Sequence, residues 1–276
     1  MTDLPVRRSP VTWVLRLVVI AYLALLVAWP VSLVATNTFA NGLDSLRALA
    51  GDPDLVAALE LTAWVAVVSV VINTLFGVSM ALLLVRTEFP GKRIVNALVD
   101  LPLSVSPIVV GLALVLVYNG RTGWFGPTLE SLGLQVIYAG PGIVMATTFV
   151  ALPLVIREVV PVLHEIGTEQ EQAARSLGAS SAQTFWRITL PGIKWAVVYG
   201  VVLSLARSLG EFGAVKVVSG NVLGETRTAT LAVEEQYLNF NQDGAYATAF
   251  VLAMVSVLCI VVVALLRPRT GSEGSP

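Results

Sequence analysis

Six long apolar stretches constrain this chain more than any other feature of its sequence. Only 13% of its residues are charged, against about 25% in a typical soluble domain. Each stretch has about 20 residues, which is enough for a helix to cross a hydrocarbon core about 30 Å thick. The sequence therefore predicts an all-α integral membrane protein with six transmembrane helices. In the 276-residue chain these stretches cover residues 11–36, 57–85, 94–118, 142–160, 193–218 and 245–266.

The first stretch follows Arg7 and Arg8 and in that respect is like the apolar part of a signal peptide. It is too long for such a region and has no small-x-small cleavage site, so we expect it to remain as an anchor helix. No repeat and no soluble domain is visible. We therefore expect one transmembrane domain over residues 11–267, with tails at 1–10 and 268–276.

Basic residues divide unequally between the two sets of helix ends. One set holds twelve, and Arg207 lies inside an apolar stretch. Basic residues are enriched on the cytoplasmic side of membrane proteins. The asymmetry predicts that both termini and the polar segment at residues 168–191 are cytoplasmic. The opposite set holds only Arg47, Arg121, Lys216 and Arg227.

The polar segment at residues 168–191 interrupts the apolar pattern. Thr168 and Glu171 have the S/T-x-x-E spacing of a capping box, so a helix is expected to begin there. Gly178 is the type of residue that ends a helix in the left-handed conformation. The sequence predicts a first helix of about two and a half turns that ends at this glycine.

A second short helix is expected after the glycine. Ser180 and Gln183 repeat the capping spacing in its S/T-x-x-Q form, and the helix is predicted over residues 184–189. Pro191 is expected to end the segment, because the residue before a proline disfavours helix. The result is a helix, a glycine corner and a second helix, a shape suited to docking against another protein.

This segment resembles the EAA loop of the permease subunits of binding-protein-dependent ABC importers. The glycine and the Ile-x-Leu-Pro group lie in the family's register, and the two alanines would let a partner approach the backbone closely. Gln172 occupies the family's glutamate position. The resemblance implies the type I ABC importer permease fold, with this loop as a cytoplasmic coupling helix between spans four and five. The residues it implies for coupling to an ATPase are Glu169, Glu171, Gln172, Ala173, Ala174, Arg175, Leu177, Gly178, Ala179, Ile188, Leu190 and Pro191.

Arg207 and Glu211 are ionisable residues within the fifth apolar stretch. They are four residues apart, so a helix would place them on one face. Such groups are costly in hydrocarbon and usually face a bundle interior or a water-filled path. Two interpretations stay open: the pair lines the translocation path, or its members neutralise each other and only hold helices together. Gly210 and Gly213 flank Glu211 and would permit close helix approach or a local break.

Two prolines in the third stretch, Pro102 and Pro107, predict a kink within one span. Ser104 and Ser106 lie between them. Their hydroxyls are candidates to contact an oxyanion in the translocation path, or else to satisfy backbone groups that the kink frees.

The remaining polar residues favour structural roles. Asn73 and Thr74 are expected to make interhelical hydrogen bonds. The only histidine, His164, lacks partners at ligand spacing, so we expect a surface residue and no metal site. Cys259 is the only cysteine and can form no internal disulfide. There is no G-x-x-x-x-G-K-[ST] sequence, so the chain is not expected to hydrolyse ATP by a P-loop of its own.

A second resemblance concerns the end of the fifth stretch. The Gly-Glu-Phe-Gly sequence at 210–213 resembles permeases for tetrahedral oxyanions, both sulfate and molybdate. The Val-Lys-Val-Val-Ser-Gly sequence at 215–220 and Gly-Glu-Thr at 224–226 are similar to the W-type permease subunits of sulfate/thiosulfate ABC importers.

This resemblance implies a non-catalytic permease subunit in a bacterial inner membrane. The implied partners are two cytoplasmic ATPases that carry ATP and Mg, a different permease subunit of T type and a sulfate-binding protein. Lipid surrounds the chain, and its net charge of −1 gives no basic surface for nucleic acid. Two alternatives stay open: a molybdate or tungstate ABC permease, and an ion-coupled secondary anion transporter without an ATPase.

Overall fold

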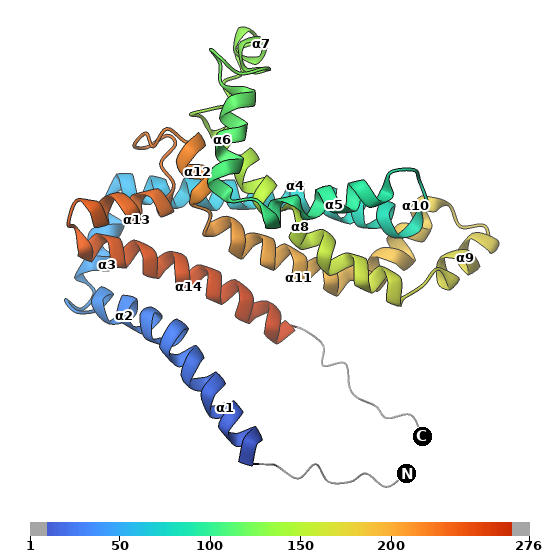
Figure 1. Cartoon of the computed structure of the whole chain (residues 1–276), viewed down its shortest axis with the longest axis horizontal. Coiled ribbons are helices and arrows are strands. Elements are labelled where there is room, and N and C mark those ends of the chain that lie inside the picture. Colours follow the sequence, from blue (N-terminus) through green and yellow to red (C-terminus); the bar gives the residue numbers. More distant parts are fainter. Residues whose placement is uncertain (1–9, 267–276) are drawn as a thin grey trace.

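The apolar stretches fold as helices in the computed structural model, which describes residues 10–266 and the side chains of 12–261. Helices α4 (Pro53–Arg86), α8 (Gly140–Glu165), α11 (Leu190–Leu209) and α14 (Gln242–Leu266) form the bundle (Figure 1). No strand occurs among the described residues. The other elements are α1 (Pro10–Leu23), the π-helical turn η1 (Ala24–Ala28), α2 (Trp29–Thr38), α3 (Asp44–Gly51), α5 (Lys92–Ser104), α6 (Pro107–Tyr118), α7 (Gly126–Ser131), α9 (Glu169–Ser176), α10 (Ser181–Thr184), the π-helical turn η2 (Phe185–Thr189), α12 (Gly213–Val218) and α13 (Ala229–Leu238).

Four of the predicted spans are confirmed as single helices. Five helices of the described chain are long and apolar enough to cross a membrane, and the number is six if one bent pair counts as a span. The predicted fold class is therefore confirmed. The expected tails, 1–10 and 268–276, lie outside the described residues except for Pro10, which begins α1.

The kink predicted in the third stretch is present, but as a full break between two helices. Helices α5 and α6 are separate, and they are bent by 112° at the break between Ser104 and Pro107. Val105 and Ser106 have ψ angles of 137° and 134°, far from helical. The proline imposes this extended conformation, because its ring clashes with a helical residue before it. Pro102, by contrast, lies inside α5 without ending it.

The fifth stretch is also shorter than predicted. Helix α11 ends at Leu209, Gly210 follows as its C-cap, and α12 is a separate helix. The sequence allowed a local break at the glycines, and the break is present. Helix α6 packs on α12 and stands out from the long axis of the bundle (Figure 1).

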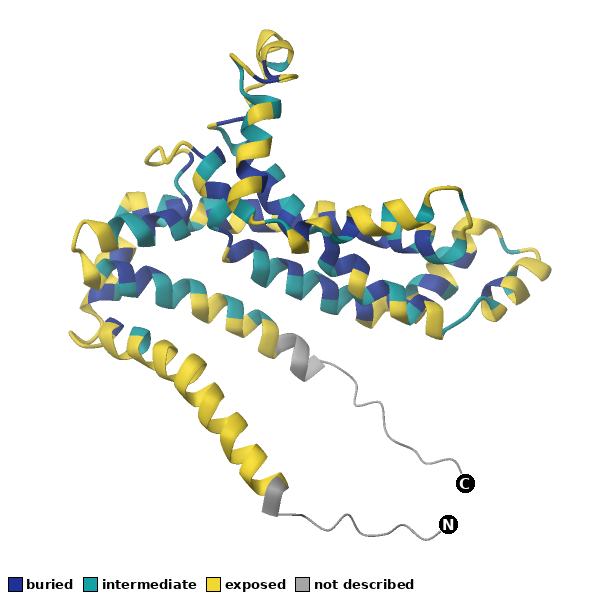
Figure 2. Ribbon diagram, viewed as in Figure 1, coloured by how far each residue is buried: buried dark blue, intermediate teal, exposed yellow. Residues whose placement is uncertain are grey.

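The core lies between α4, α8 and α11, which contribute many of the buried residues in Figure 2. Small residues let their backbones approach closely. A Cβ atom on Gly77 would lie 2.8 Å from Val155 Cβ, and one on Gly200 would lie 2.8 Å from Val155 Cα. Within membranes, packing of this kind replaces the hydrophobic effect as the main force between helices.

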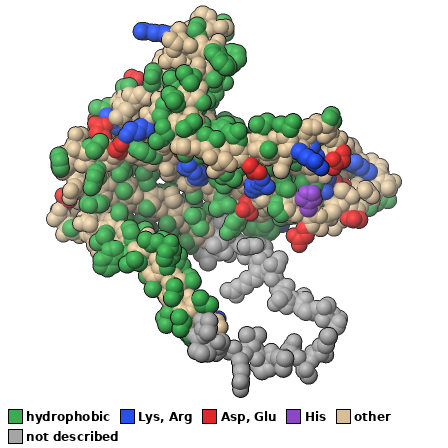
Figure 3. Space-filling model, viewed as in Figure 1, with side chains coloured by type: hydrophobic (Ala, Val, Ile, Leu, Met, Phe, Trp, Pro, Cys, Tyr) green, Lys and Arg blue, Asp and Glu red, His purple; other side chains and the backbone are tan. Residues whose placement is uncertain are grey.

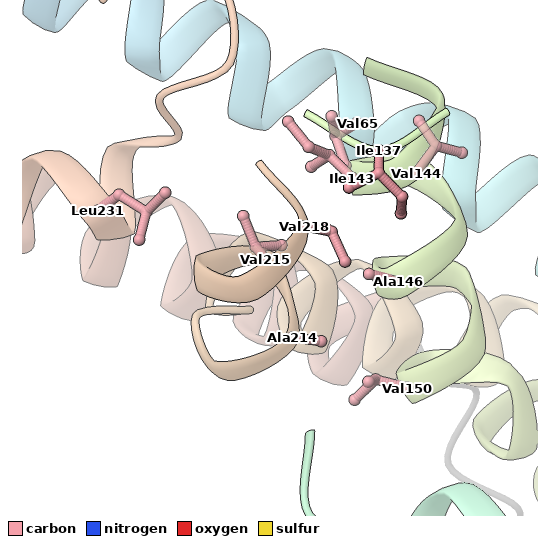
Figure 4. Close-up of a cluster of buried hydrophobic side chains, with 10 residues drawn as sticks. All are labelled: Val65, Ile137, Ile143, Val144, Ala146, Val150, Ala214, Val215, Val218 and Leu231. Carbon is pink, nitrogen blue, oxygen red and sulfur yellow. The ribbon is translucent and has the colours of Figure 1, made fainter. Parts of the chain in front are cut away.

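A second cluster of buried side chains joins the broken helices to the bundle (Figure 4). Val65 of α4, Val144 of α8, Val215 of α12 and Leu231 of α13 all belong to it. Residues 219–243 contain α13, which packs beside α14 and α4.

The first span makes few contacts with the rest of the chain. Over Thr12–Thr38 the most apolar window is 0% buried; α2 contacts α14, whereas α1 diverges from the bundle (Figures 1 and 2). Only its end is held, where the rings of Phe39 and Phe250 meet edge to face with centroids 5.1 Å apart.

Candidate functional site

The polar segment has the predicted helix–glycine–helix shape. Helix α9 ends at Ser176, and Gly178 has a φ of +88°. The N–H groups of Gly178 and Ala179 donate to the carbonyls of Arg175 and Ala174, both at 3.0 Å, and so close the end of the helix. A left-handed residue at this position needs glycine, because any Cβ would add strain. The segment lies at the end of the bundle opposite α3 and α13 (Figure 1).

The predicted capping box at Thr168 and Glu171 is wrong. Thr168 is the N-cap residue, but its side chain accepts no backbone N–H; instead its hydroxyl accepts a hydrogen bond from Gln172 Nε2 at 3.0 Å. The Glu171 carboxylate is used elsewhere, as described below. The second box is confirmed: the Ser180 N–H donates to Gln183 Oε1 at 2.9 Å, and the Gln183 N–H donates to Ser180 Oγ at 3.2 Å.

Pro191 does not end the segment, contrary to the prediction. The α10 helix is four residues long and continues through η2 into α11, so that Ser181–Leu209 is one unbroken helix. In the π-helical turn the Leu190 N–H donates to the carbonyl of Phe185, five residues back. The wider turn lies next to the proline, where an α-helical turn would bring its ring against the carbonyl four residues earlier.

Glu171 is the anchor of this segment and is only 9% exposed. Its Oε1 accepts hydrogen bonds from Arg86 Nη2 at 3.1 Å and from Thr189 Oγ1 at 2.9 Å. Arg86 also donates to the carbonyls of Leu163 at 3.1 Å and Gly167 at 2.6 Å. The Arg86–Glu171 pair therefore connects the ends of α4 and α8 with α9 and η2. The available sequence signal for Arg86 was its place directly after the apolar stretch at residues 57–85.

The other side of α9 faces away from the bundle. Leu177 is 90% exposed, which is unusual for a leucine beside so many polar residues. Ala173 and Gln172 are exposed next to it, whereas Ile188 and Leu190 are partly buried in the following helix. A surface of small residues with one protruding apolar side chain can dock into a complementary groove of another protein.

Arg207 and Glu211 form the ion pair that the sequence allowed, with Arg207 Nη1 2.7 Å from Glu211 Oε2. Glu211 is not inside the helix, however, because α11 ends two residues earlier. Its Oε1 accepts the N–H of Ala214 at 2.9 Å, and its carbonyl accepts the hydroxyl of Thr230 at 2.9 Å. The glutamate is 3% exposed, so it connects α11, α12 and α13 across the break.

The two helix breaks lie against each other. A Cβ atom on Gly213 would be 3.1 Å from Pro107 Cβ. Ser104 and Ser106 are exposed at the break between α5 and α6. Neither hydroxyl appears in a hydrogen bond within the part of the chain that the structure describes. Within the described chain, neither hydroxyl therefore bonds to the backbone groups that the break frees.

Asn73 and Thr74 of α4 differ in the contacts that they make. Asn73 Nδ2 approaches Ser204 Oγ at 3.5 Å, so the predicted interhelical contact is present but weak. Thr74 instead donates to the Val70 carbonyl of its own helix at 2.7 Å, contrary to the prediction. Thus only one of the two polar residues in this stretch connects helices.

An ion pair between Asp100 of α5 and Arg157 of α8 was not foreseen. Arg157 Nε donates to Asp100 Oδ1 at 2.7 Å, and a second bond joins Nη2 to Oδ2. Arg157 and the exposed His164 also line a cavity of about 810 Å³ beside Lys92 and Arg93. In Figure 3 the histidine (purple) lies among basic and acidic side chains on the same face. Among the described residues, no three His, Cys, Asp or Glu are placed to hold a metal ion.

Comparison with known proteins identifies one family and several related permease proteins. The model of the family "Binding-protein-dependent transport system inner membrane component" matches residues 73–271. The sulfate transport system permease protein CysW of Synechococcus elongatus is 48% identical over 252 residues, 91% of this chain and 88% of the relative. The permease protein CysT of Synechocystis is 33% identical over 257 residues, 93% of this chain and 88% of the relative.

The fold itself is shared with a solved transporter. A chain in the crystal structure of a bacterial alginate ABC transporter, in complex with an alginate pentasaccharide-bound periplasmic protein, superposes with a TM-score of 0.78. The alignment covers 98% of each chain at 18% identity, so it shows the fold alone. Helix bundle, broken helices and polar segment together define a permease of the ABC importer class. The chain belongs to the family of binding-protein-dependent transport system inner membrane components.

Proposed function

We propose that this chain is the W-type permease subunit of an ATP-driven importer for sulfate or thiosulfate. The observation that carries this proposal is its 48% identity to a sulfate permease of W type, against 33% to 38% to three of T type, each over most of the chain. The chain is the non-catalytic membrane subunit, and the substrate anion reaches it from outside the membrane.

The motor and the other subunits are separate chains. Two cytoplasmic ATPases carry the ATP and Mg, a T-type permease completes the transmembrane pair, and a sulfate-binding protein delivers the anion. The two kinds of sulfate permease among the relatives support the heterodimer. The first span supports it too, because an almost wholly exposed helix has room for a partner chain and lipid around it.

The chain is placed in the inner membrane of a bacterium with both termini in the cytoplasm. The excess of basic residues at one set of helix ends supports this orientation. Residues 11–267 form the transmembrane domain, and 1–10 and 268–276 are its cytoplasmic tails. The polar segment then faces the compartment that contains ATP.

The coupling surface is the outward side of α9 with its glycine corner. Exposed Leu177 supports this assignment, as does the continuous helix from Ser181 to Leu209, which carries a displacement of the corner into the membrane. The residues we assign to coupling are Glu169, Glu171, Gln172, Ala173, Ala174, Arg175, Leu177, Gly178, Ala179, Ile188, Leu190 and Pro191.

The translocation path passes the crossing of the two helix breaks. Free hydroxyls and an arginine that is 38% exposed on its side chain are groups that contact an oxyanion, and broken helices in membranes are tolerated where they line a cavity. The residues we assign to the path are Arg207, Gly210, Glu211, Gly213, Ser104 and Ser106.

Transport follows by alternating access. ATP closes the paired ATPases, and the coupling surface moves with them, so the pair of permeases opens outward. Hydrolysis and release reverse the movement. Such a switch requires that ATP bind one state of the complex more tightly than the other.

The test is uptake of labelled sulfate by cells with and without this chain, in the presence of excess sulfate, thiosulfate or molybdate. Sulfate and thiosulfate are expected to compete and molybdate to compete poorly. Loss of molybdate uptake with sulfate uptake intact would assign the chain to the molybdate class. Uptake that survives depletion of ATP would favour an ion-coupled transporter.

A further inference from the structure

Arg86 occupies the junction between the bundle and the coupling surface, and none of the sequence signals assigns it a role. Helix α9 makes its main contacts with α10 and η2 only. A displacement of α9 therefore reaches α11 directly through the chain. It reaches α4 and α8 through the loop after α8 and through the hydrogen bonds of Arg86.

That loop contains Gly167, where the backbone can bend and which we take as the hinge. Its φ of +63° places it in the left-handed region, where a glycine is free to change conformation. The Gly167 carbonyl accepts a hydrogen bond from Arg86 Nη2 at 2.6 Å. The Leu163 carbonyl before the hinge and the Glu171 carboxylate after it are bound by the same guanidinium.

The chemistry of this junction requires an arginine. The guanidinium presents five N–H donors in a fixed plane, whereas an ammonium is a compact charge with three. Arg86 uses three nitrogen atoms to reach acceptors on both sides of the hinge. The side chains of Arg86 and Glu171 are 15% and 11% exposed, so water competes little for these bonds.

We propose that Arg86 is a positioning residue for energy coupling: by holding Glu171 it locks the hinge at Gly167, so that α9 and the ends of α4 and α8 move as one body. This inference rests on the coupling role of residues 168–191 given above. Without the lock, the ATPase would still bind α9. Part of each displacement of α9 would then bend the chain at Gly167 and would not move α4 and α8.

The first experiment is a double-mutant cycle in the full complex, reconstituted in vesicles with the binding protein. Arg86→Gln and Glu171→Gln each leave a buried charge unpaired and are expected to reduce assembly. The double variant removes both charges and restores assembly. If the lock couples motion, the double variant still transports less labelled sulfate per ATP hydrolysed, by about fivefold or more.

The result that would overturn the proposal is a double variant with the wild-type ratio of sulfate to ATP. In that case the pair only neutralises buried charge. Arg93→Lys is the matched control, because Arg93 is exposed and nearby, and it should keep the wild-type ratio. If Gly178→Pro also keeps the wild-type ratio of sulfate to ATP, the coupling role of the loop is wrong. If the double variant keeps this ratio and Gly178→Pro does not, only the inference about Arg86 is wrong.

A second measurement does not depend on the double variant. Arg86→Lys keeps the charge but cannot reach all acceptors. Spin labels at Leu83→Cys and Ser176→Cys, in a Cys259→Ser background, report the distance between the end of α4 and α9. The distance distribution should broaden in Arg86→Lys, and a distribution identical to that of the wild type would contradict the lock.

Discussion

Pro191 lies near the first residue of α11 and Pro107 is the first residue of α6, yet the two prolines have opposite effects on the chain. At Pro191 a π-helical turn precedes the proline, and the helix runs unbroken from Ser181 to Leu209. At Pro107 two extended residues precede the proline, and α5 and α6 are bent by 112°. The surroundings therefore decide whether a proline breaks a helix. We call the region of the continuous helix at 181–191, with α9, the stiff end, and the region of the breaks at 105–106 and 210–212, with α6 and α12, the broken end.

The stiff end and the broken end are also held by different forces. Around α9 the contacts are hydrogen bonds to Glu171 and Arg86. Around the breaks, α6 and α12 are held by close backbone packing at Gly111, where a Cβ would lie 2.7 Å from the Ala214 carbonyl oxygen. The first end is suited to receive a displacement and the second to change shape in response.

The largest effect is expected from Gly178→Pro at the stiff end. The φ of +88° is impossible for proline, whose ring fixes φ near −65°. Sulfate uptake should be lost, while the amount of chain in the membrane fraction stays normal because the spans do not include this corner. Gly178→Ala is the control: no atom lies within 4 Å of its Cβ, and the strain is only about 1–2 kcal/mol, so most uptake should remain. Normal uptake in the proline variant would contradict the account.

Gly111→Val tests the broken end. The added atoms would meet the Ala214 carbonyl and Val217 Cβ, 2.8 Å from the new Cβ. Forced separation of α6 from α12 should lower the free energy of unfolding by about 1–3 kcal/mol. Thermal unfolding of the purified chain measures this, with Gly51→Ala as the control because a Cβ there meets nothing within 4 Å. Equal unfolding temperatures of the two variants would show that the close packing of α6 on α12 does not stabilise the fold.

Glu211→Gln distinguishes the two interpretations of the Arg207–Glu211 pair at the break in the fifth stretch. The amide oxygen can still accept the Ala214 N–H, but Arg207 loses its counter-charge, so stability should fall by about 1 kcal/mol. The double variant with Arg207→Gln should recover stability. If uptake recovers with it, the pair only holds helices; if uptake stays low, Arg207 lines the path, as we propose.

The smallest effect is expected from Pro191→Ala. Since the helix already passes through this position, the free energy of unfolding should change by less than about 1 kcal/mol, well below the 3 kcal/mol typical of a helix-interior proline. Thermal unfolding checks this. A large gain in stability would mean that the π-helical turn stores strain at the stiff end.

Patterns within the sequence predicted the features that depend on local chemistry. Apolar length located four spans, Gly178 marked the corner, and Ser180 with Gln183 marked a cap that the structure confirms. The errors arose where distant residues compete. Glu171 was predicted to cap its own helix, but Arg86, 85 residues away in the chain, takes its carboxylate. No local pattern predicts such a pairing.

The same reason explains the ion pair that the sequence analysis missed. Asp100 and Arg157 are 57 residues apart, and each alone looked like an ordinary residue near a helix end. The bend at Pro107 was predicted in kind but not in size, because 112° depends on how α6 packs on α12. Sequence thus located both candidate sites, while their internal contacts required the fold.

Photo-cross-linking from position 177 tests the central claim most directly. The leucine there is 90% exposed, and a photoreactive probe attached through Leu177→Cys, in a Cys259→Ser background, would report whatever binds this surface in intact cells. The account predicts a covalent product with the cytoplasmic ATPase subunit, and none from Leu132→Cys in the outer loop. A product with an external protein, or labelling of position 177 by a reagent that cannot enter the cell, would contradict it.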